Sequence, residues 1–261
     1  MEIPVYQVDA FTERAFGGNP AAVCPLESWL DDDLMQTLAL ENNLSETAFL
    51  VGRGGGEYDL RWFTPAVEVD LCGHATLASA WVLFEQMGEG AQEIVFHTRS
   101  GELRVGRAGG RLVMDFPALP ASEVDMPDGL VEALGAEPVQ FLRAVKNMAV
   151  FETEAQVRAI DPDFGYIADM EGMGLIVTAP GDESDCASRY FAPQAGVNED
   201  PVTGSAHCTV VPYWADRLGK TDIHARQVSA RSGDLYCRLN GDRVEMAGNA
   251  VMTLKGSMVL P

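Results

Sequence analysis

Basic residues are scarce in this chain. Lysine and arginine together number 18 against 39 aspartates and glutamates, so the formal net charge is −21 over 261 residues. An average field of this sign repels nucleic acid and acidic membrane surfaces, because both are polyanions. The chain is therefore expected to bind neither, and its acidity favours solubility without identifying a partner.

Cysteine and long apolar segments are also scarce. The five cysteines are an odd number and contain no Cys-x-x-Cys pair, which favours free thiols in a reducing compartment over a disulfide framework. No uncharged apolar run approaches membrane-spanning length, and the segment 1–5 lacks the basic and apolar regions of a secretory signal. A cytoplasmic protein is the expectation.

Motifs for metals and nucleotides are missing. His97, His207 and His224 show no metal-ligand spacing with the cysteines, so no metal site is predicted. The glycine-rich stretch 52–56 lacks the strand, loop and helix order of a dinucleotide or phosphate-binding loop. Ser205 lies outside any Gly-x-Ser-x-Gly elbow. No cofactor is expected.

Two apolar segments are predicted to be central helices. Residues 74–87 are apolar most of the way round, which is typical of a helix that a sheet encloses. The second helix is predicted at 205–218. Alternating or β-favouring segments bounded by glycine predict strands around the first helix, at 46–51, 58–63, 93–98, 101–105 and 111–116.

The second half of the chain repeats the first. Phe191 follows Phe63 by 128 positions, and the same offset relates Asn147 to Asn19 without a gap, whereas Gly204 follows Gly73 by 131. The prediction is an α+β fold of two pseudo-symmetric halves, each a mostly antiparallel curled sheet around a central apolar helix. The halves are placed at 1–117 and 118–261, with the last strand a candidate to pack on the first half.

The two halves carry matching loop-to-helix junctions. Gly73-His74-Ala75 and Gly204-Ser205-Ala206 place small residues where a helix begins, which leaves backbone NH groups uncovered for an anion. We expect the two junctions to face a common cleft and to hold one small-molecule carboxylate.

The duplication is broken at the residues suited to proton transfer. Cys72 aligns with Thr203, and Glu46 aligns with Gly174, so each acid/base group occurs on one side only. A cofactor-independent racemase needs two bases on opposite faces of the substrate carbon. A single group instead favours proton transfer on one face.

Each candidate also has a structural interpretation. Glu46 is a solvated strand end by residue type, but strand alternation places it on the face of Ala48 and Leu50, which is expected to be interior. His74 is either a structural histidine or a ligand of the substrate or of Asp200.

Three further residues have equally ordinary alternatives. Asp200 suits a turn before Pro201, and Ser205 suits a helix cap. Cys72 is either a small buried residue or a reactive thiol, and only the helix N-terminus argues for a lowered thiol pKa.

These motifs resemble those of the PhzF-like phenazine-biosynthesis family, within the diaminopimelate epimerase-like fold. The matching stretches are FGGNPAAV at 16–23, LSETAFL at 44–50, RWFTP followed by DLCGHAT within 61–76, and RYFAP followed by EDPVTGSAH within 189–207. The resemblance implies a cofactor-independent isomerase, often a homodimer. The best understood member moves a hydrogen between ring carbons of a dihydro-hydroxyanthranilic acid through one glutamate.

The resemblance also implies roles for individual residues. Glu46 matches the family's glutamate, and His74 and Asp200 match its polar partners, so these three are the candidate catalytic residues. The candidate substrate-binding residues are Asn19, Cys72, Gly73, Thr203, Gly204 and Ser205.

Three hypotheses remain open. The first is an isomerase in which Glu46 moves a proton on one face of a small carboxylic acid. The expected substrate is a cyclic or aromatic-precursor acid. The second is an amino-acid epimerase or racemase that uses Cys72 against another base. The third is a small-molecule binding protein that keeps the fold without turnover.

Overall fold

The chain folds into two compact units in a computed structural model that describes residues 1–260. The first unit contains Met1–Asp115 together with the segment from Ala247 onward, and the second contains Phe116–Met246. The last strand thus belongs to the first unit, where it pairs with the first strand of the chain, and the second unit ends earlier than the expected 118–261. Within residues 1–260 no helix has the length and apolarity needed to cross a membrane.

The first unit is a curled sheet with two helices. Its elements are β1 (Glu2–Ala10), β2 (Asn19–Leu26), α1 (Asp32–Asn42), β3 (Glu46–Gly54), β4 (Glu57–Phe63), β5 (Glu68–Val69), α2 (Gly73–Glu85), β6 (Glu93–Thr98), β7 (Gly101–Ala108), β8 (Arg111–Pro117) and β18 (Ala250–Val259). The order of pairing is β18, β1, β2, β3, β4, β6 and β7, then β8. Only β2 with β3 and β4 with β6 are parallel, and the connections between them contain α1 and α2.

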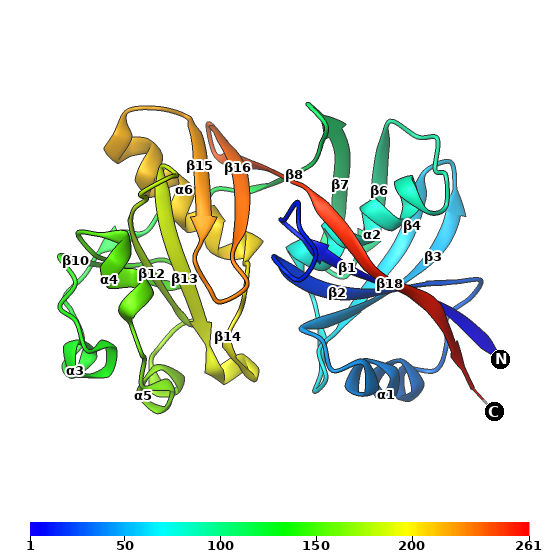
Figure 1. The fold of residues 1–261 in the computed structure, drawn as a ribbon, viewed down its shortest axis with the longest axis horizontal. Helices are drawn as coiled ribbons and strands as arrows, with labels where there is room; N and C mark the ends of the chain where they lie inside the picture. Colours follow the sequence, from blue (N-terminus) through cyan, green and yellow to red (C-terminus); the bar gives the residue numbers. More distant parts are fainter. Residues whose placement is uncertain (261) are drawn as a thin grey trace. The chain divides into compact units, whose positions relative to one another are not determined.

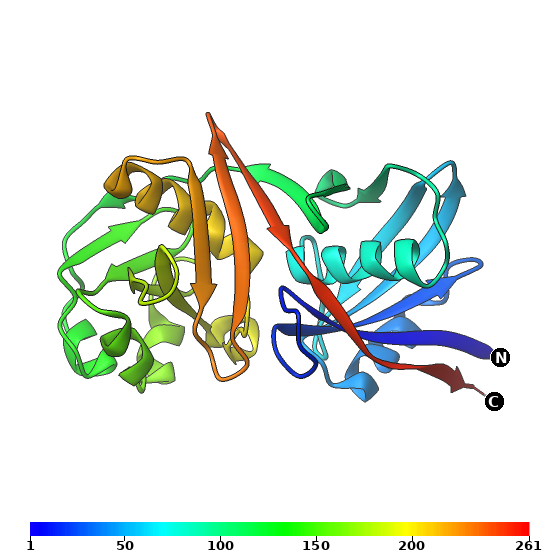
Figure 2. The ribbon, with the colours of Figure 1, turned by 45° about the horizontal axis from the view of Figure 1, so that its top comes forward.

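The two helices lie on opposite sides of β1 to β3 (Figure 1). The apolar helix α2 packs on β1, β2 and β3, and all its residues from His74 to Phe84 except Trp81 are buried. Phe49 of β3 packs with Met35 of α1 in a separate cluster, so alternation turns Ala48 and Leu50 toward α2. Both faces of the strand are therefore buried, which explains its continuous apolar sequence. Figure 2 shows α2 in side view and β18 running along β1.

The second unit has the corresponding elements. They are β9 (Ser122–Glu123), α3 (Leu130–Leu134), β10 (Gln140–Arg143), β11 (Asn147–Val150), α4 (Glu154–Ala159), α5 (Phe164–Asp169), β12 (Leu175–Pro180), β13 (Cys186–Ala192), the 3-10 turn η1 (Pro193–Ala195), β14 (Val197–Glu199), α6 (Gly204–Leu218), β15 (Asp222–Gln227), β16 (Gly233–Asn240) and β17 (Arg243–Gly248). The pairing order β10, β11, β12, β13, β15 and β16 alternates antiparallel and parallel as the order β1, β2, β3, β4, β6 and β7 does.

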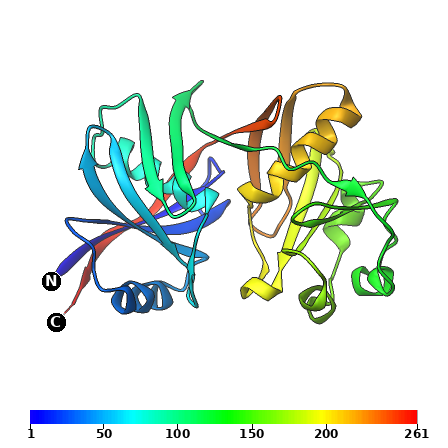
Figure 3. The same cartoon turned by 180° about the vertical axis from the view of Figure 1, so that it is seen from behind.

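The second unit likewise has helices on both sides of its strands. Helices α3, α4 and α5 pack with Leu175, Val177 and Phe191 in one apolar cluster. Helix α6 lies on the other side, where the indole NH of Trp214 donates a hydrogen bond to the Thr178 hydroxyl at 3.0 Å (Figure 3). The repeated strand order and the enclosed apolar helices confirm the predicted α+β fold of two pseudo-symmetric halves.

The strand register corrects one detail of the repeat. Thr47 pairs with Phe63 and Leu175 pairs with Phe191, so β3 and β4 match β12 and β13 at the expected offset of 128. Thr47 also pairs with Ala22, but Leu175 pairs with Asn147, which lies 125 positions after Ala22. The gap-free match of Asn19 to Asn147 was therefore wrong by three positions, and an odd shift turns Asn147 to the opposite face of its sheet.

Candidate active site

His74 is the centre of a polar cluster in the first unit. Its Nε2 lies 3.0 Å from Oε2 of Glu46, and its Nδ1 lies 3.1 Å from Nδ2 of Asn19 and 3.5 Å from Sγ of Cys72. The four residues come from the starts of β2 and β3, the residue that precedes α2 and the first turn of α2. The structure thus brings together the four candidate residues that carry polar side chains in this unit.

Local backbone structure directs Glu46 into the cluster. Glu46 is the first residue of β3 and pairs in parallel with Ala21 of β2. It shares its strand face with Ala48 and Leu50, which turn toward α2, so the carboxyl group points toward the first turn of that helix. Its side chain is 16% exposed and that of His74 is 5% exposed. The interpretation of Glu46 as a solvated strand end is thereby excluded.

The electrostatics of His74 depend on its two neighbours. Burial lowers the pKa of the imidazole, but the neighbouring Cys72 and Glu46 raise it, and the net pKa lies well above the usual 6.5. The contact with Glu46 has the distance of an ion pair, although Nε2 and Oε2 are not aligned for a hydrogen bond. An amide can present either its oxygen or its nitrogen, so Asn19 can face both the charged and the neutral imidazole.

Cys72 is not an activated thiol. Burial and the charge of Glu46 raise its pKa to about 11, despite the opposing influence of His74. Of the two alternatives for Cys72, the small buried residue therefore fits the structure, because burial outweighs the helix dipole. All five cysteines are buried and free, as the sequence predicted.

The cluster resembles a metal site in composition but not in arrangement. One ligand atom from each of Glu46, Cys72 and His74 lies within 4.8 Å of the others. The imidazole, however, turns one nitrogen toward the thiol and the other toward the carboxylate. A neutral imidazole has one nitrogen lone pair for a metal, so the three groups surround the ring and do not converge on one ion.

The matching junction in the second unit is held by Gln227. The amide oxygen of Gln227 accepts a hydrogen bond from the Thr203 backbone NH at 2.8 Å, and its amide nitrogen donates to the carbonyl of Asp200. The Thr203 hydroxyl donates to the Asp200 carboxylate. Asp200 is therefore part of an ordered turn before α6, and Gln227 is a buried positioning residue for which the sequence carried no motif.

The first turn of α6 is open to an anion. The residue that precedes the helix is Thr203, which gives no side-chain cap, and no acidic residue lies in the first turn. Ser205 is half-buried inside the helix and does not cap it. Helix α2, which begins at Gly73, also lacks a side-chain cap and a first-turn acid. Both helices, which begin at Gly73 and Gly204, therefore have N-termini without a side-chain cap, as expected of anion sites.

His207 stabilises this turn. Its Nδ1 donates to the Thr203 carbonyl at 2.7 Å, and burial lowers its pKa to about 4, so the ring is neutral near pH 7. We assign it a structural role.

Gly174 occupies the position that matches Glu46. It adopts φ +85°, and an added Cβ would lie 2.4 Å from the Phe191 carbonyl oxygen and 2.8 Å from the Tyr190 hydroxyl. A side chain is therefore not tolerated there without rearrangement. The second unit has no room for a counterpart of the Glu46 carboxylate.

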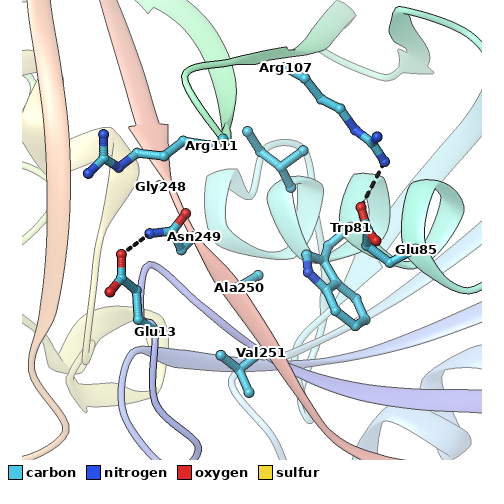
Figure 4. A pocket seen from close by; sticks show the side chains of 11 residues that line it. Glu13, Trp81, Glu85, Arg107, Arg111, Gly248, Asn249, Ala250 and Val251 are labelled. Atoms are coloured by element: carbon cyan, nitrogen blue, oxygen red, sulfur yellow. Dashed lines mark hydrogen bonds and ion pairs between the residues drawn. The ribbon is translucent and has the colours of Figure 1, made fainter.

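A pocket of about 540 Å³ lies elsewhere in the first unit. Figure 4 shows two polar pairs in its lining, because Arg107 binds Glu85 at 2.8 Å and Asn249 donates a hydrogen bond to Glu13. None of the candidate site residues lines it. The Glu46 cluster therefore lies outside this pocket.

Stability should report the charge of His74. Because the pKa of His74 is raised in the folded state, its charged form contributes to the free energy of unfolding. This contribution is complete below about pH 6.5 and is lost as the pH rises toward the folded pKa. We expect the difference in unfolding free energy between the wild type and His74→Gln to shrink from pH 6 to pH 8 in urea titrations. The surface variant His97→Gln is the control, and a difference that grows with pH would contradict the assignment.

Comparisons with known proteins identify the family of this chain. The sequence profile described as "Phenazine biosynthesis-like protein" (PhzC-PhzF) matches residues 8–256. Two proteins of Pseudomonas aeruginosa named as uncharacterized isomerases are 52% and 53% identical, with full coverage of both chains in each comparison. The crystal structure of a PhzF-family phenazine biosynthesis protein of Enterococcus faecalis superposes with a TM-score of 0.97 at 44% identity and covers both chains completely.

Proposed function

Because this chain belongs to the phenazine biosynthesis-like protein family and is an isomerase, we propose that it isomerises a small carboxylic acid by proton transfer through Glu46. The substrate class is a cyclic or aromatic-precursor acid with an activated C–H bond. The observation that carries the proposal is the enclosed contact between Glu46 and His74 in the first unit, together with Gly174 at the matching position of the second.

The proposed reaction conserves atoms and electrons. The Glu46 carboxylate takes a proton from one carbon, and the electron pair of that C–H bond moves into the conjugated system of the substrate. The neutral carboxylic acid then returns the proton to another carbon on the same face. His74, held by Asn19, stabilises the carboxylate form of Glu46 and orients it.

The remaining candidate residues are proposed to bind the substrate. Backbone NH groups at Gly73 and Gly204 suit a carboxylate, since both open an uncapped helix. Asp200, Thr203 and Ser205 are proposed as further polar contacts, and Asn19 and Cys72 as walls of the site. That all of them serve one substrate molecule in a cleft stays a prediction from the sequence. A cytoplasmic homodimer without cofactor is part of the same proposal.

The substrate can be sought directly. Purified protein is incubated in D₂O with the carboxylic acids of a cell extract, and acids that gain deuterium or change retention time are identified by mass spectrometry. Parallel incubation with Glu46→Gln removes changes due to contaminating enzymes. If no acid changes with the wild type alone in extracts that contain cyclic carboxylic acids, the proposed activity is wrong.

Replacement of Cys72 separates the isomerase from a two-base racemase. With a pKa of about 11 the thiol is not the base of the proposed reaction, so Cys72→Ser should keep turnover within about tenfold of the wild type. A racemase that uses this thiol would instead lose about 10²-fold or more and would introduce solvent deuterium with inversion. The measurement is the initial rate on the acid found in the extract experiment.

A further inference from the structure

Lys146 is a buried cation without an acidic partner. It immediately precedes β11 and is 7% exposed. Within residues 1–260, no carboxylate forms an ion pair with its ammonium group. The ammonium group instead makes a cation–π contact with the ring of Tyr190, with 5.6 Å from Nζ to the ring centroid. Yet the chain has 39 acidic residues and three lysines in total. A charge that is enclosed without a partner is costly, so its surroundings call for an explanation.

The contact with Tyr190 directs Lys146 toward α6. Lys146 itself lies in the turn before β11, but its ammonium group contacts the ring of Tyr190. Phe191 of β13 packs in the cluster with α3 to α5, so by strand alternation Tyr190 takes the opposite face, which is the side covered by α6. The electrostatic neighbours of Lys146 agree with this direction, because they are Cys208 of the second turn of α6 and Asp200 of the turn before it.

The ammonium group therefore lies near an open helix N-terminus. Burial lowers the pKa of Lys146, and Cys208 and Asp200 oppose that effect without cancelling it. Helix α6 has 15 residues and no cap at its beginning, so its dipole adds further positive potential there. Asp200 is the one carboxylate among the electrostatic neighbours of Lys146, and it does not form an ion pair with the ammonium group. An anion bound beside the helix N-terminus would therefore add compensating negative charge.

We propose that Lys146 is a positioning residue that binds a carboxylate beside the first turn of α6. The Ser205 hydroxyl and the first NH groups of the helix supply the neutral donors, while Lys146 supplies the opposite charge. The inference rests on the proposed function only in taking the anion to be the substrate's carboxylate. The same surroundings would bind any planar carboxylate of suitable size, so the inference can be tested without knowing the substrate.

The test uses benzoate as an anionic probe and benzamide as its uncharged isostere. The protein is labelled with ¹³C at the lysine ε-carbons, and three lysine signals are expected, that of Lys146 being identified by its loss in Lys146→Met. Lys220 and Lys255 are exposed and serve as internal references. Benzoate should shift the Lys146 signal saturably and leave the other two unchanged, whereas benzamide should shift none of them.

Variants of Lys146 provide the second measurement. Isothermal titration should show that Lys146→Met weakens benzoate binding by about tenfold or more, because a charge-assisted hydrogen bond is lost, and that Lys146→Arg restores most of it. Circular dichroism confirms that each variant is folded. If benzoate shifts the three lysine signals equally, or if Lys146→Met binds benzoate as the wild type does, Lys146 is only a packing partner of Tyr190 and the inference fails.

The outcome is independent of the chemistry at Glu46. Failure of benzoate to bind near Lys146 would leave hydrogen exchange by Glu46 intact, so the proposed function would stand. Conversely, loss of the proposed activity in the extract experiment would not alter the response of the Lys146 signal to benzoate.

Discussion

Turnover by the Glu46→Gln variant is expected to fall by about 10²- to 10⁴-fold, the range of a single general acid–base group. The amide keeps the size of the side chain but neither accepts nor returns a proton at neutral pH. Binding of the acid should persist, because the polar contacts proposed for the carboxylate involve other groups. The measurement is the initial rate of isomer formation, with calorimetry for binding and thermal unfolding for integrity of the fold.

The chain offers a matched control for this variant. Glu57 on the surface contacts His97 with an Oε2–Nε2 distance of 2.8 Å, and its side chain is 51% exposed. Glu57→Gln therefore removes a carboxylate from a glutamate–histidine pair without entering the Glu46 cluster. It should keep the full rate. Equal losses in both variants, or full activity of Glu46→Gln, would contradict the role of Glu46.

The largest loss of stability is expected for Gly174→Ala. The variant would have to hold an L-residue at φ +85° and also accept contacts of 2.4 Å to the Phe191 carbonyl and 2.8 Å to the Tyr190 hydroxyl. Backbone strain of this kind costs about 1–3 kcal/mol, and overpacking adds about 1–3 kcal/mol. We expect the unfolding free energy from urea titration to fall by about 3–5 kcal/mol.

Gly196→Ala separates the two contributions. Gly196 has a similar φ of +81°, but nothing lies within 4 Å of an added Cβ. It should therefore show the backbone cost alone, about 1–3 kcal/mol. If Gly174→Ala were no more destabilising than Gly196→Ala, the second unit would have room for a side chain at this position. The structural reason why only the first unit carries a glutamate here would then be lost.

Much of the fold could be predicted because its signals are local. The apolar residues of 74–87 and the glycine-bounded strands predicted an enclosed helix and its sheet, which are α2 and its neighbours. The repeat added the second unit, since Phe63 and Phe191 are true counterparts in register. The Glu46 position was equally accessible, because strand alternation alone placed it toward α2.

Features that depend on pairing over long distances could not be derived in this way. The last strand was a candidate to pack on the first half, but no local pattern encodes its pairing with β1, in which Gln7 pairs with Leu254. The three-residue shift of β11 has the same origin, because parallel register is set across strands and not along them.

The missed site residues have a different cause. Lysine and glutamine are mostly exposed, so Lys146 and Gln227 were passed over by residue type. The one available signal was that Lys146 lies just before the apolar residues 148–151. The two alternatives for Cys72 could not be decided from the sequence, since a helix N-terminus can be recognised there and the degree of burial cannot.

The most direct test of transfer through a single glutamate follows the hydrogen itself. The acid identified in the extract experiment is prepared with deuterium at the carbon that loses its proton and is converted by the wild type in ordinary water under single-turnover conditions. Because Glu46 both takes and returns the hydrogen, part of the deuterium should appear at the receiving carbon, on the face from which it left. A product whose receiving carbon holds only solvent hydrogen, delivered to the opposite face, would contradict the mechanism.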